Sequence, residues 1–297
     1  MVAAAVLLIA LGSCGASGQS SGAPRSVRSP APTASVPASA APTSERVVTM
    51  PSSAPPTAPT TSAATQAPIS SSTTTTSNAP GVDPPAERFV IGRSVQGRPI
   101  DAIERGRRGG TVVLVIGVIH GDEPAGTAVV DLLERRQLPT DIDLWLIPSM
   151  NPDGQAAKRR TNAHLVDLNR NFPRRWAPLD RPGEPEYAGT SAASEPETRA
   201  VVSLISLLRP TIVIWYHQDL NRIAPAGGHA GAVRRTYAAL TGLPVLPVTG
   251  GTYTGTASTW AQAEVERSVS FIVELGPTLG PSQAERHAAA VLAVART

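Results

Sequence analysis

The sequence has little cysteine and little lysine, and each shortage excludes a class of protein. Its single cysteine, Cys14, excludes intramolecular disulfides, zinc–thiolate clusters and a CxxC redox pair. Lys158 is the only lysine, so arginine supplies almost all of the basic charge. The main basic run, Lys158-Arg159-Arg160, is too short to form a nucleic-acid interface. We therefore expect no nucleic-acid partner, although the formal net charge is +3.

Aromatic residues are also scarce, and none lies between Gly15 and Pro85. That stretch is rich in Pro, Ser, Thr and Ala, and it carries few charges. Such a composition cannot bury enough apolar surface to offset the entropy cost of ordering the chain. We expect a disordered linker over residues 15–85, one folded domain over residues 86–297, and no inhibitory pro-domain.

No apolar run is long enough to cross a membrane, but a short one, Val2 to Leu11, opens the sequence. It ends in Leu11-Gly12-Ser13-Cys14, which resembles a bacterial lipobox, although no Lys or Arg precedes it. We expect residues 1–14 to direct export. The protein is then attached to the outer face of the cytoplasmic membrane through a lipid on Cys14, or it is secreted after ordinary signal-peptide cleavage.

The remaining sequence alternates between strand and helix patterns. Runs of Val, Ile and Leu predict buried strands at residues 112–119, 142–147, 211–216 and 270–273. Helical spacing predicts helices at residues 124–136, 194–208 and from Ser282 to the C-terminus, the last two opened by Ser-x-x-Glu capping boxes. This alternation predicts an α/β fold with a mixed, largely parallel central sheet and helices on both faces.

Three of these strands lead into chemically active side chains. His120 follows the first, His217 follows the third and Glu274 follows the fourth, while Glu123 stands three residues after His120. Ligands gather beyond the carboxyl ends of parallel strands, so these side chains should lie near one another. Two imidazoles and a carboxylate suit an open zinc site with a fourth position for water. Glu274, the carboxylate left over, would be the base that takes a proton from that water.

The most specific string in the chain is Val166-Asp167-Leu168-Asn169-Arg170-Asn171-Phe172-Pro173. Together with His120-Gly121-Asp122-Glu123, Asn151-Pro152-Asp153-Gly154 and the early segment from Gly92 to Ile100, it resembles the M14 family of zinc carboxypeptidases. The resemblance runs from about Ile91 to Pro277. It implies a zinc carboxypeptidase fold, one Zn²⁺ per chain and a metallopeptidase or amidase activity.

Residue by residue, the resemblance implies zinc ligands at His120, Glu123 and His217, and a general base at Glu274. It implies that Asn169 and Arg170 hold the terminal carboxylate of the substrate, since a guanidinium binds a carboxylate with two hydrogen bonds. Further roles implied are stabilisation of the oxyanion by Arg160 and orientation of His120 by Asp167. One departure is Leu165, where bacterial members usually have Gly, so we expect a differently shaped loop there. The role of Tyr253 stays open.

Within the family, Tyr253 to Trp260 and His217-Gln218 are similar to bacterial murein-peptide amidases, which hydrolyse the γ-D-glutamyl-diaminopimelate bond of cell-wall peptides. We therefore expect a monomeric enzyme acting on murein peptides. Two alternatives stay open: an acyl-amino-acid deacylase of the aspartoacylase or succinylglutamate desuccinylase type, and a non-catalytic wall-binding module. Export and the complete Asp167–Pro173 string argue against the deacylase, and the full set of competent site residues argues against the module.

Overall fold

The computed structural model describes residues 85–297. The expected signal segment that ends at Cys14, and the expected linker as far as residue 84, lie outside the described residues. The boundary at residue 86 thus stays a prediction.

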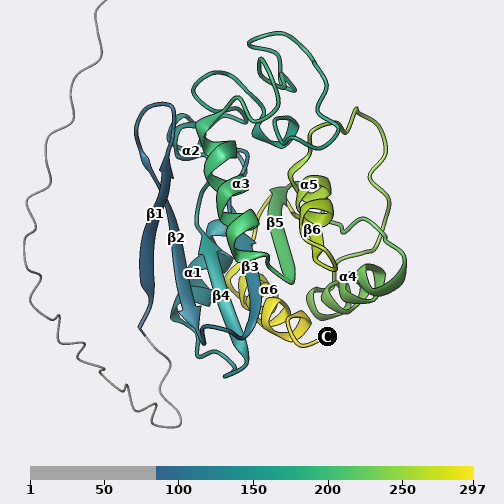
Figure 1. Cartoon of the computed structure of the whole chain (residues 1–297). Helices are drawn as coiled ribbons and strands as arrows, with labels where there is room; N and C mark the ends of the chain where they lie inside the picture. The colour runs from purple at the N-terminus through teal and green to yellow at the C-terminus, as the bar shows by residue number, and fades with distance from the viewer. Residues whose placement is uncertain (1–84) are drawn as a thin grey trace, which may run out of the picture. The chain divides into compact units, whose positions relative to one another are not determined.

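Six strands form one sheet in the order β1-β2-β4-β3-β5-β6 (Figure 1). Strands β4, β3, β5 and β6 are parallel, whereas β1, β2 and β4 pair antiparallel. The bounds are β1 Glu87–Arg93, β2 Pro99–Gly106, β3 Thr111–Ile116, β4 Ile142–Ile147, β5 Ile212–Gln218 and β6 Val269–Leu275. The mixed, largely parallel sheet predicted from the sequence is confirmed.

Helices cover both faces of this sheet, as predicted. Side chains alternate along each buried strand, so Val113 and Val115 pack on one face while Leu114 and Ile116 pack on the other. The first face is covered by α1 Gly126–Arg135, α4 Gly228–Thr241 and α6 Pro281–Val294. The second is covered by α3 Pro196–Leu208 and α5 Ala257–Glu264. Among residues 85–297, none of the helices has the length and hydropathy that a bilayer span needs.

The β1–β2 hairpin was not predicted, because β1 is an exposed edge strand without a buried alternating pattern. Its turn is attached to α2 Pro152–Ala157, a short helix beside the candidate site. Asp153 of α2 accepts hydrogen bonds from Ser94 Oγ and from Gln96 N, both at 2.9 Å. Gly97 closes the turn with a φ of +79°, a conformation that glycine adopts without strain. The hairpin therefore supports the segment around Asn151 from outside the parallel sheet.

Both predicted capping boxes are wrong. Helix α3 begins after Glu195, and the Ser194 hydroxyl donates instead to the Glu195 carboxylate at 2.7 Å. Helix α6 begins after Gly280, whose N–H donates to the Gln283 side chain at 2.8 Å. In each case proline occupies the start of the helix, where its missing N–H costs nothing. The proline moves the helix start away from the serine that the sequence pattern favoured.

Candidate metal and catalytic centre

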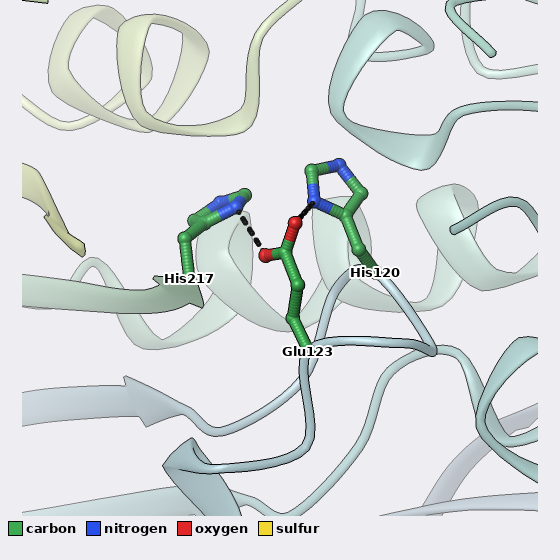
Figure 2. Close-up of side chains that lie close together, drawn as sticks. All are labelled: His120, Glu123 and His217. Carbon is green, nitrogen blue, oxygen red and sulfur yellow. Dashed lines mark hydrogen bonds and ion pairs between the residues drawn. The ribbon is translucent and has the colours of Figure 1, made fainter. Parts of the chain in front are cut away.

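The structure brings His120, Glu123 and His217 together at the carboxyl end of the parallel strands. One ligand atom from each residue lies within 4.8 Å of the others. Figure 2 shows the Glu123 carboxylate pointing between the two imidazole rings, with one oxygen directed to each. The Oε1 atom lies 2.8 Å from His120 Nδ1, and Oε2 lies 3.0 Å from His217 Nδ1. Both Nδ1 atoms therefore face the same small volume.

The segment that carries His120 and Glu123 is shaped by contact with the Asn151–Gly154 segment. A Cβ on Gly121 would lie 2.0 Å from the carbonyl carbon of Gly154, so no other residue fits there. Asn151 Nδ2 donates to the carbonyl of Ile119 at 3.0 Å and to that of Arg160 at 3.2 Å. The glycine is thus required by close approach of two backbones. The two motifs seen in the sequence form one structural unit.

The buried Asp167 orients His120. Asp167 Oδ1 lies 3.1 Å from His120 Nε2, which leaves Nδ1 of that ring for the metal. Burial opposes protonation of His120, but Asp167 and Glu123 outweigh it and raise the pKa of the ring to about 9. Burial also disfavours the charged carboxylates, yet the neighbouring His120 holds the pKa values of Glu123 and Asp167 well below their usual range. The surroundings of His120 Nδ1 therefore favour positive charge.

A zinc ion fits this group of side chains. Two imidazoles and a carboxylate form a donor set that zinc prefers, so His120, Glu123 and His217 would hold the ion, with His120 giving up its proton on binding. Burial lowers the pKa of His217, so that ring is neutral and available as a ligand. Its other nitrogen, Nε2, is buried without a hydrogen-bond partner.

Arg160 reaches the same centre. Its Nη2 donates to Asp167 Oδ2 at 2.8 Å, and its Nη1 lies 3.1 Å from His120 Nδ1 and 3.5 Å from Glu123 Oε1. Burial lowers the pKa of the guanidinium, but Asp167, followed by Glu123 and Glu186, reverses this and raises it. A permanent cation thus borders the metal group, where the resemblance placed the residue that stabilises an oxyanion.

Glu274 lies beside this group on the neighbouring strand, where it pairs in register with His217. Its Oε2 atom is buried and has no hydrogen-bond partner. Burial, reinforced by the nearby Glu123 charge, raises the pKa of Glu274 to about 7. A carboxyl group with this pKa can both accept and return a proton near neutral pH.

Asn169 and Arg170 lie close by in the short 3-10 turn η1, Leu168–Arg170. Asn169 Oδ1 accepts from the first N–H of α5, Ala257 N, at 3.0 Å. Arg170 is 3% exposed, and its guanidinium lies 5.4 Å from the ring centre of Tyr253. Tyr253 itself is 53% exposed. The predicted carboxylate-binding residues are therefore assembled next to the metal group, with Tyr253 stacked over the arginine.

Two residues near the site were not assigned roles from the sequence. Gln218, directly after His217, donates its N–H to Glu123 Oε2 at 3.1 Å, and its side-chain oxygen accepts from Ala125 N at 2.9 Å. Its place next to a ligand was a signal in the sequence. Glu186 pairs with Arg170 from a loop rich in proline and glycine, and no sequence pattern marks it.

A family model for zinc carboxypeptidases (Peptidase M14) matches residues 84–223. Murein peptide amidase A of Vibrio campbellii is 30% identical over 220 residues, covering 68% of this chain and 85% of the amidase. The Escherichia coli K12 amidase of the same name is 33% identical over 158 residues, covering 47% of this chain and 62% of the amidase. The crystal structure of murein-tripeptide amidase MpaA from Escherichia coli O157 matches with a TM-score of 0.57 and 26% identity, covering 72% of this chain and 92% of that one.

This chain belongs to the M14 family of zinc carboxypeptidases. The resemblance seen in the sequence is thereby confirmed, and zinc is the metal of this family. The chain spans 62% of the length of the Escherichia coli K12 amidase and 28% of carboxypeptidase SOL1 from Arabidopsis thaliana.

Proposed function

We propose that this protein is a zinc-dependent metallocarboxypeptidase or amidase that hydrolyses a peptide amide bond next to a free carboxylate. The observation that carries the proposal is the paired register of His217 and Glu274. It sets a carboxylate with an unpartnered oxygen beside the three-residue metal group.

Zinc held by His120, Glu123 and His217 would supply Lewis-acid chemistry, which lowers the pKa of water and polarises a carbonyl. Glu274 accepts the proton of the attacking water and then delivers it to the nitrogen of the leaving amine. Arg160 stabilises the negative charge that develops on the carbonyl oxygen. Asp167 holds His120 by its Nε2 atom, so that Nδ1 keeps its direction throughout.

The substrate class proposed is a murein peptide, cleaved at the γ-D-glutamyl-diaminopimelate bond. Two relatives support this choice: the amidase of Vibrio campbellii, of which this chain covers 85%, and murein-tripeptide amidase MpaA of Escherichia coli O157, which shares the fold. Arg170 and Asn169 would hold the free carboxylate of the leaving residue, and this fixes which amide bond lies at the metal group.

An extracytoplasmic location belongs to the same proposal. Its support is the apolar segment that ends at Cys14 and the composition of residues 15–85, together with a substrate that lies outside the cytoplasmic membrane. Labelled fatty acid incorporated by the wild-type protein but not by Cys14→Ser would test lipid attachment. Equal labelling of both forms would contradict it.

The test of the activity is release of diaminopimelate from L-Ala-γ-D-Glu-meso-diaminopimelate by the zinc-loaded protein, followed by mass spectrometry beside ordinary α-linked dipeptides. We expect Glu274→Gln to lower kcat by about 10²–10⁴-fold with zinc content unchanged, because the proton acceptor is lost. Glu266→Gln is the matched control, since that side chain is 84% exposed. Release only from α-linked peptides would contradict the murein substrate. No release from either peptide would contradict the proposed peptidase or amidase activity.

A further inference from the structure

Both terminal nitrogens of the Arg170 guanidinium already have a protein partner. Nη1 donates to the carbonyl of Asn169 at 3.0 Å, and Nη2 donates to the Glu186 carboxylate. The third nitrogen, Nε, is buried without a hydrogen-bond partner. Glu186 therefore stands where the proposed function places the carboxylate of the substrate.

The backbone around Glu186 is fixed to the site itself. Glu186 N donates to Asp180 Oδ2 at 3.0 Å, and the carbonyl of the next residue, Tyr187, accepts from Asp167 N at 2.8 Å. The carbonyl of Ala188 then accepts from Asn171 Nδ2 at 2.9 Å. The loop is thus held from both sides. The side chain of Glu186 is 32% exposed, so it borders solvent as well as Arg170.

A substrate carboxylate that takes Nη2 of Arg170 displaces Glu186 and leaves two carboxylates side by side. Like charges in a partly buried site disfavour each other. A leaving residue that also carries a cation relieves this, because the displaced carboxylate forms a new ion pair with it. A leaving residue with a neutral side chain forms no ion pair with the displaced Glu186 carboxylate, so the repulsion between the two carboxylates remains.

We propose that Glu186 is a specificity residue that selects leaving residues bearing an ammonium or guanidinium group in addition to their carboxylate. This inference rests on the proposed function, since it assumes that the leaving residue binds at Arg170. Diaminopimelate, with a second amino group on its side chain, belongs to the selected class.

The kinetic test compares L-Ala-γ-D-Glu-L-Lys with L-Ala-γ-D-Glu-L-norleucine, which differ only by the terminal ammonium. We expect kcat/KM of the zinc-loaded protein to favour lysine by about tenfold or more, the size of one charged hydrogen bond. Glu186→Gln, which keeps an oxygen acceptor for Arg170, should lower kcat/KM for lysine, raise it for norleucine and abolish the preference. Glu184→Gln is the matched control, because Glu184 is an exposed residue on the same loop whose carboxylate accepts a hydrogen bond from Arg181 N.

A binding test separates this inference from the proposed activity. Titration calorimetry would measure the Kd values of free L-lysine and L-norleucine for zinc-loaded Glu274→Gln protein, with and without Glu186→Gln. Failure to cleave any peptide would remove the proposed function, while the ratio of the two Kd values would still report on Glu186. The inference is overturned if lysine binds no better than norleucine, if its advantage survives Glu186→Gln, or if that substitution improves both ligands equally.

Discussion

At the scale of the residue, this site depends on hydrogen bonds that give each side chain one direction and one charge state. Asp167 is an example, because it accepts from His120, Arg160 and its own turn at Asn169 N. Its burial is tolerated only because these donors surround it. A change of one atom in such a residue should alter the metal group without altering the fold.

Asp167→Asn tests this role directly. We expect zinc affinity to fall by about 10–100-fold, because the amide no longer stabilises the ligating tautomer of His120 as a carboxylate does. Competition with a chromogenic chelator measures the affinity. Asp131→Asn, at an exposed position of α1, is the control. Equal zinc affinity in all three proteins would show that Asp167 has no orienting role.

The resemblance places glycine at the position of Leu165, and the structure gives this position a backbone conformation that favours glycine. Leu165 has a φ of +63°, in the left-handed region. The loop keeps its turn through Asn162, whose carbonyl accepts from Leu165 N at 3.1 Å. A non-glycine residue in this conformation carries backbone strain of about 1–2 kcal/mol, and the differently shaped loop stays a prediction.

Leu165→Gly should raise the free energy of unfolding by about 1 kcal/mol, because the strain it relieves exceeds the extra conformational entropy that glycine loses on folding. Urea unfolding of the wild type, Leu165→Gly and Leu165→Ala measures the effect. Alanine keeps the strain and removes only the contacts of the leucine side chain. Glycine no more stable than alanine would argue against a strained loop.

At the scale of the element, the packing of α6 against α4 and the sheet buries a histidine away from the metal group. His287 of α6 is 4% exposed, and its Nδ1 lies 2.9 Å from the Tyr237 hydroxyl. Tyr237 in turn hydrogen-bonds to Tyr216 of β5 at 2.6 Å. This buried network ties three elements together, so His287 has a structural role that the sequence did not indicate.

Burial, with a smaller contribution from Arg286, lowers the pKa of His287 to about 4. The unfolded chain takes up a proton below about pH 6.5, but the folded protein does not do so until about pH 4. The free energy of unfolding should therefore fall as the pH falls through this window, by as much as about 3 kcal/mol from this residue.

His287→Gln should remove that part of the pH dependence, because glutamine does not titrate. Denaturant unfolding of the metal-free proteins at about pH 7 and at about pH 5 gives the comparison, and the difference between variant and wild type isolates His287 from the zinc ligands. The same loss of stability in both proteins would contradict a neutral buried imidazole.

At the scale of the whole molecule, residues 85–297 contain the six-stranded sheet, its two helical layers and every candidate site residue. The composition of residues 15–85 opposes formation of a folded inhibitory segment. We expect residues 86–297 alone to match the full-length chain in kcat/KM within about twofold, measured on the same murein peptide. A large gain in activity on trimming would instead indicate inhibition by the N-terminal part.

The sequence alone determined the chemistry and the general architecture. Long Val, Ile and Leu runs are driven to burial wherever they pair, so the parallel strands and the positions of His120, His217 and Glu274 could be predicted from local pattern. The antiparallel β1–β2 hairpin could not, because its exposed edge strand has no such pattern. The predicted starts of helices α3 and α6 were wrong, because in each case a proline near the predicted serine cap occupies the first turn.

Only the tertiary structure decided how these residues act. The raised pKa of Glu274 arises from burial and from Glu123, which lies on a distant part of the chain. Gly121 is required by the backbone of Gly154, and Glu186 meets Arg170 through a loop held by other residues of the site. Burial, the electrostatic field at a side chain and close backbone contacts all depend on residues that are neighbours in space. Those neighbours come from distant parts of the chain, so no local stretch of sequence contains them.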